Sequence, residues 1–228
     1  MTAVEILGLC PILTVAGDEA LRAMSCMAHN RVYEVDEPVV LAGDAGNAVF
    51  FLGSGRVKVH RTSENGEETI LGFLSPGDLF GELSILDDEP RSADVTAVTR
   101  AEVAVLSRDD FWACLDRYPA LSRQVLAVQC ARLRASDHHL LSVASQDISS
   151  RVAARLLDLA RRHPSDTPEG PSIAIRLTQG DLAEMVGATR ESVNRALGAF
   201  KSKGWVRWDR GTVTLLKPED LRRRAGRV

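Results

Sequence analysis

The pattern of apolar and polar positions changes along the chain. Short helices are predicted near residues 3–10 and 17–28, and beyond them apolar side chains recur at every second position. These alternating segments are spaced about 8–12 residues apart and are separated by turn signals, of which Asn65-Gly66 is a strong hairpin signal. The predicted strands cover residues 32–35, 39–41, 48–52, 56–60, 69–74, 93–98 and 101–106. Such a series is typical of an antiparallel barrel or sandwich.

From Arg108 onward the period becomes helical, and two series of residues repeat every seven positions. Their members are Leu126, Leu133 and Leu140, and, three positions after each, Gln129, Ser136 and Val143. This spacing predicts a seam along which the helix pairs with its own copy. The alternative is a helix that packs on its own barrel. The polar members Gln129 and Ser136 could fix the register of the pair or contact a ligand buried at the interface.

A second helical segment begins after Gln146. Asp147 is predicted to cap a helix over residues 148–162, so we place a domain boundary there. Residues 163–172 hold three prolines and Gly170, which predicts a polar surface loop. The predicted domains are residues 1–107, a barrel; 108–146, a dimerisation helix and hinge; and 147–228, a separate C-terminal domain.

The C-terminal domain contains the pattern of a helix-turn-helix. Thr178 and Asp181 form a variant capping box that opens a short helix. Gly187 provides the permissive backbone of a tight turn, and Thr189 caps a second helix that ends at Gly204. The apolar stripe of the second helix consists of Val193, Ala196, Leu197 and Phe200. Two short helices around a glycine turn are typical of a DNA-reading module.

The exposed face of the second helix carries the predicted base contacts. Arginine suits the O6/N7 edge of guanine, and glutamate accepts a hydrogen bond from cytosine N4. The residues expected at base edges, with Ser192 beside them, are Arg190, Glu191, Asn194 and Arg195. Those expected at phosphates are Thr178, Gln179, Thr189 and Lys201. An alternative exists for Glu191, since an acid in the first turn of a helix is favourable anyway.

After this helix the alternation of apolar and polar residues returns. Residues 205–208 and 212–215, joined by Asp209-Arg210-Gly211, predict a hairpin that forms a wing beside the second helix. The terminal Arg222-Arg223-Arg224 run could contact DNA or form a solvated end, and we favour the solvated end.

The net charge of −3 conceals an asymmetry between the two parts of the chain. Residues 1–146 carry 12 basic and 21 acidic side chains, and residues 147–228 carry 16 basic and 10 acidic ones. An acidic domain joined to a basic one indicates that the basic part faces nucleic acid.

Cysteine spacing and the N-terminus bear on location and on competing functions. Four dispersed cysteines and the lack of a signal-like N-terminus favour a reducing cytoplasm, and they argue against a disulfide framework or an iron–sulfur sensor. Haem ligation would need axial residues; His60, His138 and His139 are present, but not in a spacing that indicates it. Enzymatic motifs are also missing, and a regulatory subunit acting on protein partners would leave the helix-turn-helix unexplained.

The sharpest motif runs from Phe80 to Ala93. Gly81 lets backbone N–H groups approach an anion, Arg91 supplies a charged fork, and Ser92 supplies a hydroxyl for phosphate oxygens. Glu82 accepts hydrogen bonds only, which suits ribose hydroxyls. The alternatives are an ordinary turn with a surface ion pair between Glu82 and Arg91, or a cassette that no longer binds nucleotide.

This motif resembles the phosphate-binding cassette of the cyclic AMP receptor protein (CRP/FNR) family of bacterial regulators, and residues 190–195 resemble its recognition helix. The resemblance covers nearly the whole chain. It implies an α+β fold, with an N-terminal jelly-roll-like antiparallel β-barrel that binds cyclic nucleotide, a long dimerisation helix and a C-terminal winged helix-turn-helix.

The family's functional residues carry over position by position. Ribose-phosphate contacts are implied for Gly81, Glu82, Leu83, Arg91 and Ser92. The family's adenine-contacting hydroxyl pair falls on Ser136 and Asp137, where Asp137 departs from the family's serine and puts a contact from the other subunit in doubt.

The resemblance also implies how the protein acts. A homodimer controlled by cyclic AMP would read a palindromic site with TGTGA-like half-sites, and residues 163–172 would lie where family members touch RNA polymerase. The alternative function is a family regulator that binds DNA without cyclic nucleotide or responds to another signal.

Overall fold

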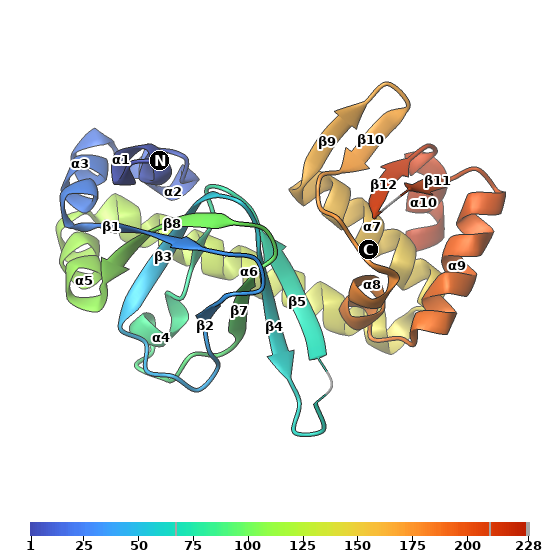
Figure 1. Ribbon diagram of the computed structural model, residues 1–228, viewed down its shortest axis with the longest axis horizontal. Coiled ribbons are helices and arrows are strands. Elements are labelled where there is room, and N and C mark those ends of the chain that lie inside the picture. The colour runs from blue at the N-terminus through green and yellow to red at the C-terminus, as the bar shows by residue number, and fades with distance from the viewer. Residues whose placement is uncertain (67, 210, 227–228) are drawn as a thin grey trace. The chain divides into compact units, whose positions relative to one another are not determined.

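The computed structural model describes residues 1–66, 68–209 and 211–226. The chain divides into two compact units, an N-terminal unit of Met1–Arg132 and a C-terminal unit of Leu133–Val228. The border falls within one continuous helix, α6 (Pro119–Ser145) (Figure 1). The three-domain division expected from the sequence stays a prediction.

Two four-stranded antiparallel sheets form the N-terminal unit. Their strand orders are β1-β8-β3-β6 and β2-β7-β4-β5. The strands are β1 (His29–Tyr33), β2 (Pro38–Val40), β3 (Ala48–Ser54), β4 (Val57–Thr62), β5 (Glu68–Leu74), β6 (Leu79–Phe80), β7 (Asp94–Ala97) and β8 (Ala101–Ser107). Both sheets contribute to one apolar core, which confirms the jelly-roll-like plan and the α+β class, although the sheets do not close into a single barrel. The two-residue strand β6 was not predicted, because it is too short to show a period.

Strand β3 explains why its sequence is apolar throughout. Val49 and Phe51 pack into a core shared with helices, while Phe50 and Leu52 pack into the core between the sheets. Successive side chains of a strand point to opposite faces, so a strand with both faces covered loses the apolar–polar alternation. This strand therefore separates two cores.

Helices cover the outer face of the sheet that contains β3. The helices of the N-terminal unit are α1 (Ala3–Gly8), α2 (Pro11–Ala16), α3 (Asp18–Met27), α4 (Leu83–Leu86), α5 (Arg108–Arg117) and the first half of α6. The sequence predicted one helix over residues 3–10, whereas α1 ends at Gly8 and a separate helix, α2, begins at Pro11. Proline is well tolerated at the first position of a helix, and this explains why a new helix starts there.

The C-terminal unit consists of helices and one four-stranded antiparallel sheet with the strand order β11-β12-β10-β9. Its elements are α7 (Ile148–Arg162), β9 (Pro164–Thr167), β10 (Gly170–Ile173), α8 (Gln179–Val186), α9 (Arg190–Ser202), β11 (Val206–Asp209), β12 (Thr212–Leu215) and α10 (Pro218–Ala225). Asp147 caps α7 by accepting a hydrogen bond from the backbone N–H of Ser150 at 2.8 Å. The predicted wing is β11 and β12; Arg210, in its turn, lies outside the described residues.

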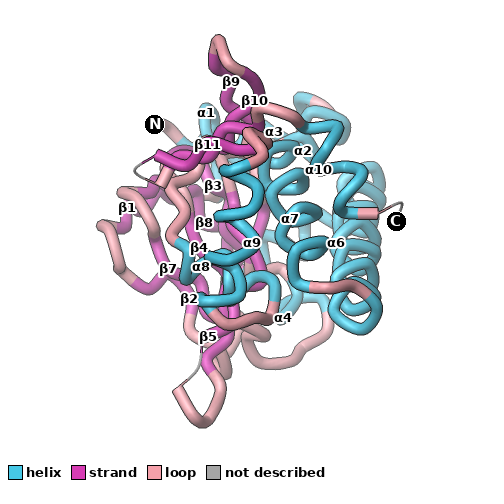
Figure 2. Tube along the Cα trace, turned by 90° about the vertical axis from the view of Figure 1, so that its right-hand side faces the viewer, coloured by secondary structure: helices cyan, strands magenta, loops and turns pink. Residues whose placement is uncertain are grey.

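The prediction of a surface loop over residues 163–172 is wrong. Strands β9 and β10 form a hairpin there that projects from the helices (Figures 1 and 2). Prolines signal a loop, but Pro164 is the first residue of an edge strand, where its missing N–H costs nothing. The Thr167 hydroxyl donates to the carbonyl oxygen of Gly170 at 2.8 Å and helps to close the turn.

The arginines at residues 222–224 lie in the last turn of helix α10, where Arg222 and Arg223 are exposed, in agreement with the predicted solvated end. Arg222 pairs with Glu219 and Arg223 pairs with Asp220, each three residues earlier on the helix. Arg224 donates from Nη2 to both carboxylate oxygens of Asp147 at 2.7 Å. The end of the described chain is therefore tied to the start of α7.

Candidate functional site

Arg91 is a buried charged side chain of the N-terminal unit with several hydrogen-bond partners. It is 7% exposed, and its guanidinium donates from Nη1 to the Ser84 hydroxyl at 2.9 Å and to the Gly81 carbonyl, and from Nη2 to the Ala48 carbonyl at 2.7 Å. Its centre lies 5.6 Å from the ring centroid of Phe50. Burial lowers the pKa of Arg91, and the charge of Glu82 acts in the opposite direction. The fork is fixed in place by the protein.

A pocket opens beside this guanidinium. Its volume is about 260 Å³, and it is lined by Pro38, Val39, Val40, Leu41, Asp44, Ala45, Phe50 and Arg91. Apolar walls with one fixed charged group are typical of a small-ligand site. The residues of this site suit a small anion that carries an apolar portion.

Gly81 holds the turn beneath Arg91. Its φ is +78°, and a Cβ atom there would lie only 2.8 Å from Arg91 Nη1 and 3.1 Å from the Phe50 ring. A side chain at this position would combine a strained backbone with displacement of the guanidinium. The predicted need for glycine in this motif therefore has a physical basis.

Glu82 is buried to 1% exposure but does not pair with Arg91. Its Oε1 accepts from Arg132 Nη1 at 2.6 Å and from Gln129 Nε2 at 2.9 Å, both on helix α6. Its Oε2 is buried and has no hydrogen-bond partner among the described residues. An unsatisfied buried acceptor costs about 1–3 kcal/mol, and more when charged. The alternative of a surface ion pair between Glu82 and Arg91 is wrong, and the free oxygen fits a ligand hydroxyl.

The other residues predicted for the ligand site are more exposed. Leu83, which begins α4, is 41% exposed, and Ser92 is exposed while its carbonyl accepts from Arg61 Nη1 at 2.9 Å. Ser136 and Asp137 are exposed on the part of α6 that belongs to the C-terminal unit. The structure thus gathers Gly81, Glu82 and Arg91, and the roles of the others stay predictions.

Sequence reasoning missed several residues that support this site. Ser84 receives a bond from Arg91, and Arg108 donates to the carbonyls of Gly46 and Ser84. Arg132 also donates to the carbonyl of Leu79. Arg108 and Arg132 lie 24 to 62 residues from the carbonyls that they contact, so no local pattern reveals these contacts, whereas Ser84 and Arg91 are only seven residues apart. The polar seam residue Gln129 was the one signal available.

The helix-turn-helix forms as the sequence predicts. Thr178 and Asp181 make the reciprocal capping box of α8, with the Asp181 N–H donating to the Thr178 hydroxyl at 3.0 Å and the Thr178 N–H to the Asp181 carboxylate at 2.8 Å. Gly187 ends α8 with left-handed backbone, φ 61° and ψ 52°. The Thr189 hydroxyl caps α9 by accepting from the Ser192 N–H at 3.3 Å. The start of α8, the end of α8 and the start of α9 are therefore each stabilised by a capping residue or a glycine.

Helix α9 presents the polar side chains that were predicted to contact DNA. Its apolar stripe, Val193, Ala196, Leu197 and Phe200, is buried. The exposed residues are Thr189, Arg190, Glu191, Asn194, Arg195 and Lys201, together with Thr178 before α8; Gln179 and Ser192 are half-buried. The arrangement leaves one polar face available to a groove of DNA.

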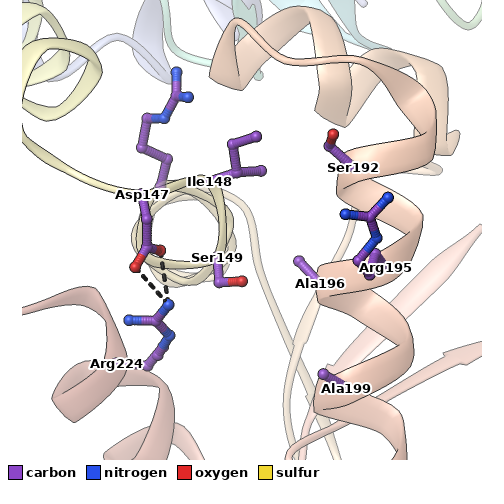
Figure 3. A pocket seen from close by; sticks show the side chains of 9 residues that line it. Asp147, Ile148, Ser149, Ser192, Arg195, Ala196, Ala199 and Arg224 are labelled. Atoms are coloured by element: carbon purple, nitrogen blue, oxygen red, sulfur yellow. Dashed lines mark hydrogen bonds and ion pairs between the residues drawn. The ribbon is translucent and has the colours of Figure 1, made fainter.

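A groove of about 610 Å³ lies between α9 and the first turn of α7 (Figure 3). Ser192 and Arg195 line it from α9, and Ile148 and Ser149 line it from α7. On the side away from α9, Arg224 pairs with Asp147. The predicted base-reading residue Arg195 therefore lies at the edge of a groove with hydroxyl and cationic walls.

Within the described residues, no helix is long and apolar enough to cross a membrane. The same residues contain no group of three or more histidine, cysteine, aspartate or glutamate side chains that could hold a metal ion.

Comparisons with known proteins agree with both units. The cyclic nucleotide-binding domain family matches residues 30–118, and the Crp-like helix-turn-helix domain family matches residues 150–224. The CRP-like cAMP-activated global transcriptional regulator of Mycobacterium tuberculosis is 34% identical over 223 residues, which cover 97% of this chain and 99% of that protein.

Solved structures show the same architecture. The Thermus thermophilus catabolite activator protein has a TM-score of 0.55 at 33% identity and covers 94% of this chain and 98% of its own. FixK2 from Bradyrhizobium japonicum has a TM-score of 0.77 at 22% identity, covers 88% of this chain and 98% of its own, and shows the fold alone. With a cyclic nucleotide-binding domain followed by a DNA-reading domain, the chain belongs to the CRP/FNR family of transcription regulators, which are not enzymes.

Proposed function

We propose that this regulator responds to cyclic AMP and, as a homodimer in the cytoplasm, reads a palindromic DNA site with TGTGA-like half-sites. The observation that carries the ligand proposal is the buried Arg91 guanidinium, which lines a pocket of about 260 Å³ and is fixed by Gly81, Ser84 and Ala48. A phosphate is the anion that such a fork suits best. Similarity to a cAMP-activated regulator supports the same ligand.

The ribose of the ligand is proposed to contact Glu82. The buried Oε2 of this carboxylate can accept a hydroxyl that the described residues do not supply. Leu83 and Ser92 flank the site and are proposed to complete the ribose-phosphate contacts. A cyclic ribose phosphate carries both groups that the proposal needs, an anion for Arg91 and a hydroxyl for Glu82.

The base of the ligand is proposed to be chosen by Ser136 and Asp137 on α6. Adenine carries a donor, its amino group, where guanine carries the O6 acceptor. The Asp137 carboxylate can accept a hydrogen bond from the adenine amino group, but it can also accept from the N–H donors of guanine, so it does not by itself choose between the two bases. We expect cyclic AMP to bind more tightly than cyclic GMP because the chain is similar to a cAMP-activated regulator, and Asp137→Ser tests whether this carboxylate contributes to the preference.

Dimerisation is proposed to occur along α6. One series of leucines on this helix is largely exposed to water: Leu126 is 62% exposed, Leu133 63% and Leu140 67%. A row of exposed apolar side chains of this kind marks a surface that binds a partner. Burying a leucine side chain completely contributes about 1.5–3 kcal/mol, so three from each copy offer on the order of 6–12 kcal/mol after allowing for their partial exposure. A second copy would present two recognition helices about 34–36 Å apart, which is one turn of DNA.

DNA contact is proposed through α9 and the residues that precede α8 and α9. Arg190, Glu191, Asn194 and Arg195 would face base edges, with Ser192 beside them, and Thr178, Gln179, Thr189 and Lys201 would face phosphates. The hairpin β9–β10 is proposed as a contact for RNA polymerase. Domain limits at residues 107 and 146 belong to this proposal as well.

Isothermal titration of the full-length protein with cyclic AMP and cyclic GMP tests the ligand. Saturable heat with cyclic AMP, stronger than with cyclic GMP, supports the proposal. No heat with either nucleotide, and unchanged DNA affinity in their presence, would establish the alternative of a family regulator that acts without cyclic nucleotide or responds to another signal.

A further inference from the structure

Gln129 lies on the predicted dimer seam and also contacts the proposed ligand site. Its place in the second heptad series, with Ser136 and Val143, puts it on the predicted seam between two copies of α6. In the structure its amide also donates to Glu82 Oε1 at 2.9 Å. A residue of the seam thus contacts the carboxylate that is proposed to receive the ligand hydroxyl.

The position of Glu82 is set from helix α6. Both donors to its Oε1, Gln129 and Arg132, are three residues apart and therefore share one face of that helix. The other oxygen, Oε2, is buried without a partner among the described residues. A ligand hydroxyl that donates to Oε2 shares the charge of this carboxylate with the two α6 donors on Oε1 and can change the orientation of the group.

Gln129 is suited to transmit such a change. A glutamine amide has two N–H donors and one acceptor oxygen, and the bond to Glu82 uses one donor. The remaining donor and the oxygen can pair across the seam with the second copy. Leucine at this position would pack a seam more tightly, whereas a polar residue in a seam fixes the register at a cost in stability.

We propose that Gln129 is a positioning residue that couples the Glu82 carboxylate to the contact between two α6 helices. This inference rests on the proposed dimer and ligand site. When a ligand hydroxyl bonds to Glu82, the hold of that carboxylate on Gln129 weakens, and the amide is released to the seam. Occupation of the pocket thereby changes the stability of the dimer.

A double-mutant cycle without ligand tests the coupling. Full-length wild type, Gln129→Met, Glu82→Gln and the double variant are compared by their dimer dissociation constants in analytical ultracentrifugation, with thermal melting to confirm folding. Substitutions of residues in contact are not additive in free energy. We therefore expect the change in the dimer dissociation constant of the double variant to differ by about fivefold or more from the product of the two single changes. Combined effects within twofold of the product, or a wild type that never dimerises, would overturn the inference.

The matched control is Gln124→Met, which makes the same chemical change on the same helix away from both seam series. Its effect should combine with Glu82→Gln within twofold. If Glu82→Gln does not fold, Gln129→Glu replaces it: a second carboxylate beside Glu82 should shift the dimer dissociation constant by about fivefold or more, and Gln124→Glu should not. Equal effects at positions 124 and 129 would overturn the inference.

A second arm adds cyclic AMP. The ratio of dimer dissociation constants with and without nucleotide should fall by about fivefold or more in Gln129→Met and stay unchanged in Gln124→Met. The same ratio in both variants would count against the coupling. A wild type that binds no cyclic AMP in calorimetry would refute the ligand proposal alone, because the cycle without ligand still decides the role of Gln129.

Discussion

Replacement of Arg91 by lysine should separate the charge of this side chain from its geometry. The guanidinium reaches the Ala48 carbonyl from Nη2 at 2.7 Å and the Ser84 hydroxyl from Nη1 at 2.9 Å, while being only 7% exposed. A lysine ammonium is a single point and cannot reach both sides at once, so at least one acceptor loses a charged donor. Arginine also offers a phosphate two parallel N–H donors where lysine offers a single point. A hydrogen bond to a charged group contributes about 1.5–3 kcal/mol, so the loss of one such bond to the phosphate should reduce nucleotide affinity about 10–150-fold.

Calorimetric titration with cyclic AMP measures this loss, and denaturant unfolding measures the stability cost, expected at about 1–3 kcal/mol. Arg100→Lys is the matched control, because the Arg100 side chain is 56% exposed in ion pairs with Glu34 and Glu102. Surface changes of this kind stay within about 0.5 kcal/mol. If Arg91→Lys binds cyclic AMP within twofold of wild type, the reasoning about the fixed fork is refuted.

Four other substitutions test the C-terminal unit. Arg224→Ala should lower unfolding free energy by about 0.5–1 kcal/mol, since its ion pair with Asp147 is partly exposed. The hydrogen bond from Arg224 lowers the pKa of Asp147 below 3.8, so in acid the unfolded chain binds more protons than the folded one. Wild-type stability should therefore fall as the pH drops from about 3.8 through the folded pKa. The same acid sensitivity in Arg224→Ala would contradict this. Arg190→Ala should remove about 1–3 kcal/mol of discrimination at one base position in a binding-site library, whereas Lys201→Ala should weaken all sites alike and reduce the salt slope by about 1; uniform weakening by Arg190→Ala would assign it to phosphate. Thr189→Ala should destabilise α9 by about 0.5–2 kcal/mol in thermal unfolding, with Thr189→Ser as control, and equal melting of both variants would argue against the cap.

Local chemistry made much of the fold predictable. The alternation of apolar residues predicted most strands of the N-terminal unit. Thr178, Gly187 and Thr189 predicted the limits of both helices of the DNA-reading module, because caps and glycine turns are encoded within four residues. The hairpin β9–β10 was missed because Pro164 and Pro171 signal a loop, although one begins an edge strand and the other faces Asp166 within the pairing.

The ligand site was predictable only in part. Gly81, Glu82 and Arg91 lie close together in the sequence, and the structure gathers them. The partners of Glu82 are 47 and 50 residues away along the chain. Which of two arginines a buried glutamate pairs with depends on the packing of α6 beside it, and no sequence period encodes that choice.

Control of DNA binding by cyclic AMP is the central claim, and fluorescence anisotropy of a labelled duplex with two TGTGA half-sites tests it most directly. The protein is titrated onto this duplex and a scrambled one, each with and without saturating cyclic AMP, at one fixed salt concentration. We predict that the nucleotide lowers the Kd for the palindrome by about 5–150-fold and that scrambling removes this gain. An identical Kd with and without cyclic AMP, or equal binding to both duplexes, would contradict the claim.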